Sequence, residues 1–192
     1  MRIDHVIYAA RDLDAAAARM QTELGLTVVG GGRHEGLGTH NKIVPLGDGY
    51  LELLAVADHD QATSSDLGAA LLARLDAVGD GLLGWAVTVD DVDPVAARLG
   101  IEVTTIARQG LTARLTGVAE AMRDPYLPFF ISRDHGIPDP AGVADAGGIT
   151  SLELAGDEKR LGRWLGGASL PVRFGDGPPG VLSMGIGTRE LR

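Results

Sequence analysis

Two residues of the N-terminal quarter, His5 and Glu52, have side chains that could carry acid–base or metal-ligand chemistry. Along its strand-like segment, Glu52 alternates with Tyr50 and Leu54, whereas the residues between them are wholly apolar. The apolar side must face the core, so Glu52 points to the other face of the sheet. An unpaired carboxylate there would cost several kcal/mol, so we expect a function as ligand, general base or orienter of His5. The alternatives are an Arg pair for Glu52 and a buried, hydrogen-bonded histidine for His5.

Several other side chains could line the same face. His40 and Asn41 are neighbours on a predicted strand and therefore point to opposite faces, so one of the two can reach the site. The spacing does not decide which. Trp85, Phe129 and Phe130 would form an apolar end of a binding cavity, or belong to an ordinary core.

The triplet Gly30-Gly31-Gly32 precedes Arg33 and His34. These two residues either gate a cavity and bind an anionic substrate, or lie in a solvated loop. The triplet is not a phosphate loop, because it lacks the Gly-Lys-Ser/Thr continuation and no helix is predicted after it. The sequence also has no Gly-x-Ser-x-Gly elbow and no cysteine, which excludes disulfides, thiolate nucleophiles and Cys-ligated metals.

The composition indicates a folded domain, or two small modules sharing a core. The chain has 192 residues, of which 45% are hydrophobic and 22% charged. With a net charge of −9, the chain lacks the excess of positive charge expected of a protein that binds nucleic acid or an anionic membrane. The sequence has no apolar run of the ~18 residues that a membrane helix needs, and Asp4 argues against a signal peptide, so we expect a cytoplasmic protein. Two Lys against 15 Arg, with abundant Ala and Gly, are typical of a GC-rich bacterial genome.

The order of predicted elements repeats along the chain. Asp12-Leu13-Asp14 begins a helix that Gly25 ends, and Asp91-Val92-Asp93 begins a second helix that Gly100 ends. The predicted strands cover residues 3–9, 26–29, 39–46, 50–56, 82–89, 102–106, 111–116, 127–131, 149–154, 172–174 and 181–186. We therefore divide the chain into a βαβββ module (1–56), a connecting helix (57–81), a second βαβββ module (82–135), and a linker with a shorter βαββ-like unit packed on the same domain (136–192).

This order predicts an α+β fold. One helix per module cannot cover both faces of a four-stranded sheet, so the uncovered face must pack on a partner or curl around a ligand. Two modules side by side would form one curved mixed sheet with helices on its convex face. The concave face would then hold the functional cavity.

Four stretches of the chain resemble glyoxalase-like domains of the vicinal oxygen chelate superfamily. They are Arg2-Ile3-Asp4-His5-Val6 with the following Asp12-Leu13-Asp14, Gly38-Thr39-His40-Asn41, Leu46-Gly47-Asp48-Gly49-Tyr50-Leu51-Glu52-Leu53, and Leu127-Pro128-Phe129-Phe130-Ile131. The resemblance covers roughly residues 1–135. It implies paired βαβββ modules, and in the metal-dependent members a divalent ion bound by the first and fourth strands of each module.

On this resemblance, His5 and Glu52 occupy the ligand positions of the first module. An imidazole and a carboxylate suit Zn²⁺, Mn²⁺, Ni²⁺ or Fe²⁺. The second module supplies no counterpart, because Gly84 and Trp85 stand where His5 would recur and residues 127–131 contain no acid. A third ligand would have to come from His40 or, as weaker candidates, from His34 or His135.

The resemblance implies a protein that binds a small oxygenated molecule in its cup. Glu52 would be catalytic, and Asn41, Trp85, Phe129 and Phe130 would contact the substrate. One hypothesis is a divalent-metal-assisted lyase, isomerase or dioxygenase. The alternative is a metal-free binding protein of the sequestration or resistance type; an inactive relative with a subunit role is a third. Family members often form dimers, so a homodimer is a further expectation.

Overall fold

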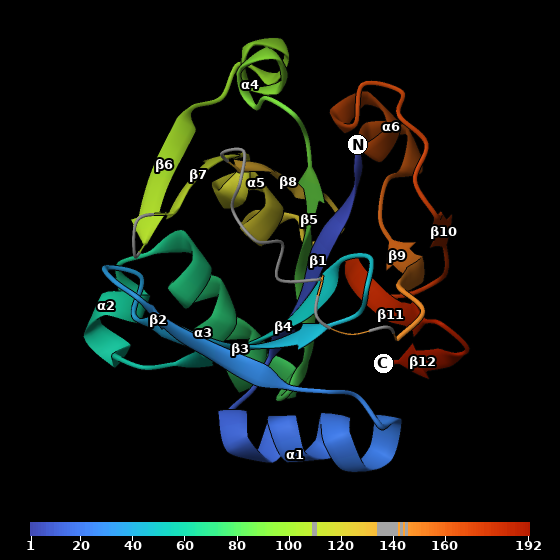
Figure 1. Cartoon of the computed structure of the whole chain (residues 1–192). Helices are drawn as coiled ribbons and strands as arrows, with labels where there is room; N and C mark the ends of the chain where they lie inside the picture. The colour runs from blue at the N-terminus through green and yellow to red at the C-terminus, as the bar shows by residue number, and fades with distance from the viewer. Residues whose placement is uncertain (109–110, 134–141, 143, 145) are drawn as a thin grey trace.

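The computed structural model describes residues 1–108, 111–133, 142, 144 and 146–192. It contains two β-sheets with helices packed around them (Figure 1). The helices are α1 (Leu13–Leu24), α2 (His59–Thr63), α3 (Asp66–Val78), α4 (Asp93–Leu99), α5 (Val118–Arg123) and α6 (Glu158–Trp164).

Sheet A has eight strands and curls into a half-barrel. Its order is β2-β3-β4-β1-β5-β8-β7-β6. These strands are β1 (Arg2–Ala9), β2 (Val29–His34), β3 (Thr39–Pro45), β4 (Tyr50–Val56), β5 (Gly81–Thr88), β6 (Val103–Arg108), β7 (Leu111–Thr116) and β8 (Phe129–Arg133). Strands β1 and β4 run parallel, as do β5 and β8, and β1 joins β5 antiparallel at the centre. The predicted α+β fold with a curved mixed sheet is confirmed.

Sheet B is formed by the C-terminal part of the chain. Its order is β10-β9-β11-β12, with strands β9 (Ile149–Ala155), β10 (Val172–Phe174), β11 (Gly180–Ile186) and β12 (Arg189–Leu191). Buried Leu152, Leu154 and Met184 join the same core as Val6 and Leu53 of sheet A. Sheet B therefore packs on the outer face of sheet A, beside α6 (Figure 1).

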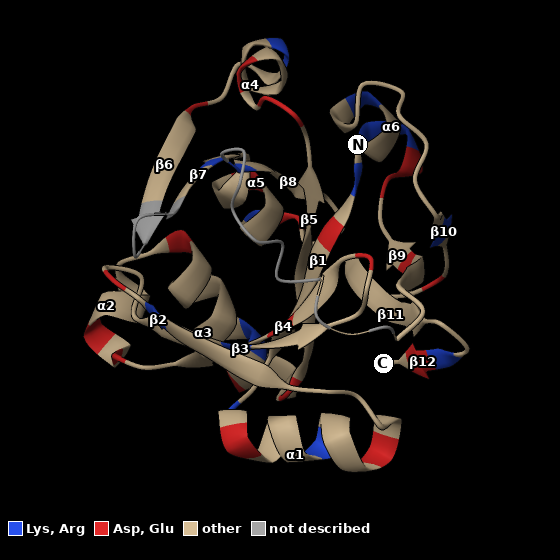
Figure 2. Cartoon of the chain, in the orientation of Figure 1, with Lys and Arg blue, Asp and Glu red and all other residues tan. Residues whose placement is uncertain are grey.

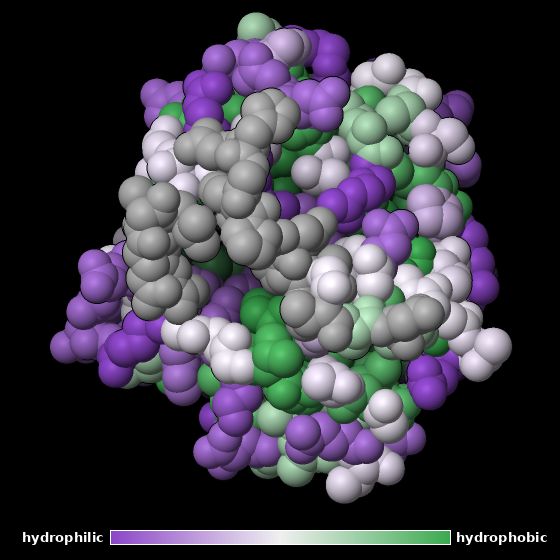
Figure 3. All heavy atoms as spheres, in the orientation of Figure 1, coloured by the Kyte–Doolittle hydropathy of each residue, from purple (hydrophilic) through white to green (hydrophobic). Residues whose placement is uncertain are grey.

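The first helix shows how local signals fix an element. Asp12 caps α1 by accepting hydrogen bonds from the backbone N–H groups of Asp14 and Ala15. Gly25 ends the helix in the left-handed conformation, with φ of 62°. Leu13, Ala16, Ala17 and Met20 turn inward, while the solvent side of α1 is a mixture of hydrophilic and small apolar residues (Figure 3).

Helices occupy both faces of sheet A. Helices α1 and α4 contribute buried residues to the outer core. Helices α3 and α5 place Leu71, Leu75 and Ala121 against Ile7 and Leu54 on the inner face. In Figure 1, α3 and α5 lie inside the curve of the sheet. The concave face is therefore partly filled by the chain's own helices.

Several predicted boundaries were wrong. The second strand is β2, so the glycine triplet lies inside an edge strand and not after a strand. Helix α5 and strand β12 were not predicted, and β8 extends to Arg133 rather than ending at Ile131. These segments are short, and tertiary packing rather than local pattern decides whether they form.

None of the helices in the described ranges is both long and apolar enough to cross a membrane. Figure 2 shows acidic and basic residues interspersed along the helices and strand ends.

The shared core predicts the effect of removing one sheet B side chain. Leu152→Ala should lower the free energy of unfolding by about 2–5 kcal/mol, because Leu152 is fully buried. Denaturant unfolding followed by circular dichroism should keep one cooperative transition. Val78→Ala, at an exposed position, is the control and should change stability little. Two separate transitions in the Leu152 variant would contradict a common core.

Candidate functional site

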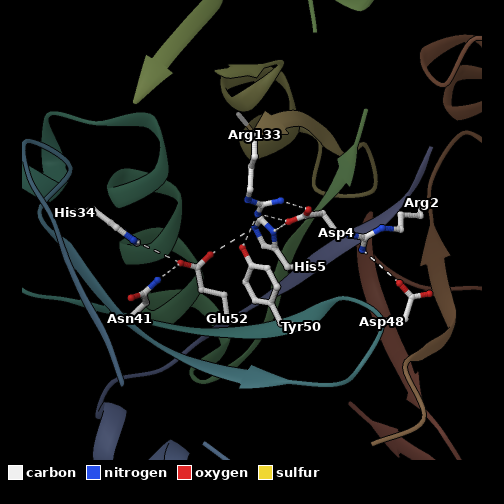
Figure 4. A network of polar contacts seen from close by, with 9 residues as sticks. All are labelled: Arg2, Asp4, His5, His34, Asn41, Asp48, Tyr50, Glu52 and Arg133. Carbon is white, nitrogen blue, oxygen red and sulfur yellow. Dashed lines mark hydrogen bonds and ion pairs between the residues drawn. The ribbon is translucent and has the colours of Figure 1, made fainter. Parts of the chain in front are cut away.

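His5 and Glu52 meet on the concave face of sheet A. They lie on the parallel neighbours β1 and β4, where His5 pairs with Tyr50 and Ile7 with Glu52. The Nε2 atom of His5 lies 3.6 Å from Oε2 of Glu52 (Figure 4). Both residues are buried, with exposures of 4% and 8%. An imidazole and a carboxylate are thus held close together in a buried site.

A β-bulge adds a second carboxylate to this pair. Ile3 pairs with Val87 and His5 with Ala86, so Asp4 is an extra residue in the ladder between β1 and β5. Simple alternation would point Asp4 away from His5, yet its Oδ1 lies 2.6 Å from Nδ1 of His5. The bulge therefore places two successive side chains in one polar cluster.

Arg133 neutralises Asp4 from the other half of the sheet. Its guanidinium donates to both carboxylate oxygens, with 2.7 Å between Nη2 and Oδ1. Burial alone would raise the pKa of Asp4, but the hydrogen bonds from Arg133 and His5 outweigh it and hold that pKa well below its usual range. Asp4 is therefore a carboxylate that accepts from Nδ1–H of His5, which leaves Nε2 facing Glu52.

Two aromatic rings hold the imidazole in place. The Tyr50 ring stacks on His5 with 4.6 Å between ring centroids, and Phe129 meets it edge-on at 5.4 Å. Arg133 also donates to the Tyr50 hydroxyl over 3.2 Å. Burial, and then the charges of Asp4 and Glu52, raise the pKa of Tyr50 well above 10, so its hydroxyl stays neutral.

Asn41 and His34 approach Glu52 from the opposite side. Nδ2 of Asn41 donates to Oε1 of Glu52 over 2.5 Å, and Nε2 of His34 lies 3.6 Å from the same oxygen. His34 is held by Thr39, whose Oγ1 lies 2.9 Å from its Nδ1. His34 and Thr39 line a surface hollow of about 280 Å³ that also borders Gln61. His34 therefore both approaches Glu52 and borders this hollow.

The structure brings some of the predicted site residues together and separates others. Asn41 shares the face of Glu52, whereas His40 lies on the opposite side of β3. His40 lines a hollow of about 530 Å³ beside α1, to which Gly31, Gly32 and Asn41 also contribute. Phe129 contacts His5, but Trp85 and Phe130 belong to the outer core. His135 lies outside the described residues.

The sequence did not predict three members of the cluster as site residues: Asp4, Tyr50 and Arg133. Asp4 was missed because a bulge cannot be read from alternation. Tyr50 could have been found, since it shares the face of Glu52 two residues away. Arg133 lies just beyond the strand end that the sequence predicted.

A model of the glyoxalase-like domain family matches residues 3–166 of the chain. The chain belongs to this family, within the vicinal oxygen chelate superfamily. A search of curated proteins finds none whose sequence matches it significantly.

Solved structures share the fold of this glyoxalase-like domain. A hypothetical protein from Staphylococcus aureus is 15% identical, with a TM-score of 0.67 over 93% of this chain and 87% of the other. A Streptomyces coelicolor methylmalonyl-CoA epimerase variant in complex with 2-nitronate-propionyl-CoA is 23% identical, with a TM-score of 0.53 over 69% and 96%. The Mycobacterium tuberculosis methylmalonyl-CoA epimerase is 22% identical, with a TM-score of 0.50 over 69% and 86%. At these identities the likeness concerns the fold alone.

Members of the superfamily often use a divalent metal, and the His, Asp and Glu side chains of the cluster are the candidate ligands for one in this glyoxalase-like domain. His5 has the carboxylate partner that metal-bound histidines usually have. However, Oε1 of Glu52 already accepts from Asn41, and both oxygens of Asp4 are bonded to Arg133. His34 also approaches Glu52, yet among the described residues no group of three or more His, Asp or Glu side chains is placed so that it could hold a metal ion. A tight site usually needs at least three protein ligands, so this donor set does not fit one.

Metal addition checks this conclusion. A metal bound to the folded state at a hundredfold excess over its Kd would add about 2.7 kcal/mol to stability. We expect no rise in Tm with Mn²⁺, Ni²⁺, Zn²⁺ or Fe²⁺ in differential scanning fluorimetry of chelator-treated protein. A rise that disappears in Glu52→Ala would show that the cluster does bind metal.

The buried Asp4–Arg133 pair predicts an acid-sensitive stability. Asp4→Asn leaves the Arg133 charge without its carboxylate partner, which should cost about 3–5 kcal/mol in urea unfolding at neutral pH. Because the folded-state pKa of Asp4 is lowered from 3.8, its contribution is complete above that value and is lost as pH falls below it. The stability difference between wild type and variant should therefore shrink from pH 6 to pH 3. An unchanged difference would contradict the role of the Asp4 charge.

Proposed function

We propose that this glyoxalase-like domain binds a small oxygenated carbon acid at the His5–Glu52 pair. It then moves a proton on the carbon next to the carbonyl group, as an isomerase, epimerase or lyase does. The cluster supports acid–base chemistry because its imidazole and its carboxylate are close, buried and individually oriented. The poor metal fit leads us to derive the reaction from the chain's own residues.

The observation that carries the proposal is the placement of the His5 imidazole between two carboxylates. Asp4 lies 2.6 Å from one ring nitrogen, and Glu52 lies 3.6 Å from the other. Asp4 fixes the proton on Nδ1, so Nε2 is the nitrogen that exchanges protons. A carboxylate that orients a histidine in this way is a recurring element of catalytic sites.

The proposed reaction conserves protons over one cycle. The Glu52 carboxylate takes the proton from the substrate carbon, and the electron pair of that C–H bond moves to the carbonyl oxygen to form an enolate. His5 in its protonated form returns a proton from Nε2 to the carbon. The pair is restored when the proton on Glu52 passes to His5 across the 3.6 Å that separates them.

The comparisons suggest the first compounds to test. Two of the similar structures are methylmalonyl-CoA epimerases, one of them in complex with 2-nitronate-propionyl-CoA. Methylmalonyl-CoA carries an acidic C–H between two carbonyl groups. A thioester of this kind, together with 2-oxo and 2-hydroxy acids, forms a suitable panel for this chain.

Hydrogen exchange tests the reaction without knowledge of the product. In D₂O the wild type should replace the α-proton of at least one compound with deuterium, as followed by ¹H NMR. Glu52→Gln and His5→Gln should each slow the exchange by about 10²–10⁴-fold, the usual contribution of a positioned acid or base. Glu23→Gln, which changes an exposed carboxylate on α1, is the matched control and should exchange at the wild-type rate.

Binding and catalysis are separated by a parallel titration calorimetry measurement. A compound that binds the wild type but shows no exchange would contradict proton transfer and would support the alternative of a metal-free binding protein. Exchange that survives in Glu52→Gln would remove Glu52 from the mechanism.

A further inference from the structure

The glycine triplet of β2 lies against Asn41 and has no role in the reaction described above. Gly30 pairs with Lys42 and Arg33 with His40, so Gly31 and Gly32 together face the single residue Asn41. This is a β-bulge on an edge strand. The bulge brings the backbone of β2 unusually close to the side chain that bonds Glu52.

The hydrogen bonds of Asn41 determine which way its amide points. The backbone N–H of Gly32 donates to Oδ1 of Asn41 over 2.9 Å. A backbone N–H can only donate, so the atom facing it must be the amide oxygen and not the NH₂ group. The NH₂ group must then face Glu52, where it donates to Oε1 over 2.5 Å. The direction of donation therefore runs from Gly32 through Asn41 to Glu52.

The close approach requires glycine at position 31. A Cβ atom there would lie 2.2 Å from both Oδ1 and the backbone oxygen of Asn41, which is far inside van der Waals contact. A Cβ at Gly30 would meet nothing within 4 Å. Neither residue has a positive φ, so the requirement at Gly31 comes from space and not from backbone conformation.

We propose that the Gly31–Gly32 bulge is a positioning device for the base. It fixes the Asn41 amide so that its NH₂ group always donates to Oε1 of Glu52, and this hydrogen bond keeps Oε1 from taking a proton. The other oxygen, Oε2, which lies nearer His5, is then the one that takes the substrate proton. Gly31, Gly32 and Asn41 act through Glu52, so this inference rests on the proposed function.

Alanine at Gly31 tests the device, with Gly30→Ala as its matched control. Gly31→Ala should push Asn41 away and slow deuterium exchange by about 10–10²-fold, because a misplacement of about 1 Å can cost that much. Substrate affinity should change little, so that the loss appears in the rate and not in Kd. Gly30→Ala should keep the rate within about twofold, since its methyl group enters open space.

A spectroscopic signature distinguishes positioning from general damage. In ¹⁵N-labelled protein, the Asn41 side-chain NH₂ resonances should shift when Glu52→Gln removes the carboxylate. The same signals should be displaced in Gly31→Ala and unchanged in Gly30→Ala. Wild-type signals and a wild-type exchange rate in Gly31→Ala would overturn the inference.

Asn41→Leu covers the case in which Gly31→Ala does not fold. Leucine is similar in size to asparagine, but it can neither accept from Gly32 nor donate to Glu52. Loss of exchange comparable to that expected for Gly31→Ala supports the device, and a wild-type rate overturns it.

The NH₂ resonances of Asn41 also show which of the two proposals fails, the proposed function or the positioning by the bulge. If no compound exchanges with the wild type, the proposed function fails. The NH₂ resonances then decide the inference alone: displacement in Gly31→Ala but not in Gly30→Ala supports the positioning device, and equal spectra overturn it.

Discussion

The carboxylate of Asp4 is 1% exposed, and a charge so deeply buried must be neutralised where it lies. Arg133 supplies the countercharge from β8, across the intervening strand β5. The same carboxylate holds the Nδ1 side of His5. One ion pair therefore joins the two halves of sheet A and fixes the imidazole on which the rest of the site is arranged.

The packing of sheet A decides where a ligand can bind. Helices α3 and α5 fill part of the concave face with Leu71, Leu75 and Ala121. Ala86 of β5 pairs with both His5 and Phe129, and its small side chain lets these two rings meet across the strand. The polar cluster is thus walled by aromatic and aliphatic side chains, and such low-polarity surroundings strengthen the interactions among its charges.

Glu52 is held by its surroundings from two directions. Asn41 occupies one carboxylate oxygen, while the other lies toward His5. Asn41 is in turn held by a backbone N–H in a glycine bulge. Two bulges, one at Asp4 and one at Gly31–Gly32, orient the pair, in keeping with the frequent occurrence of bulges beside functional sites.

The sequence by itself determined the α+β fold, the helix limits at Asp12 and Gly25, and the concave placement of Glu52. These features depend on periodicity and capping, which are local properties of the chain. It left open the choice between His40 and Asn41, which register against β4 settled in favour of Asn41.

Only the tertiary structure decided that Asp4, Tyr50 and Arg133 join His5, and that Trp85 and Phe130 do not. Contacts across strands far apart in sequence depend on register, and one bulge changes the face to which a side chain points. The packing of α3 and α5 inside the curve likewise depends on long-range contacts that no local pattern encodes.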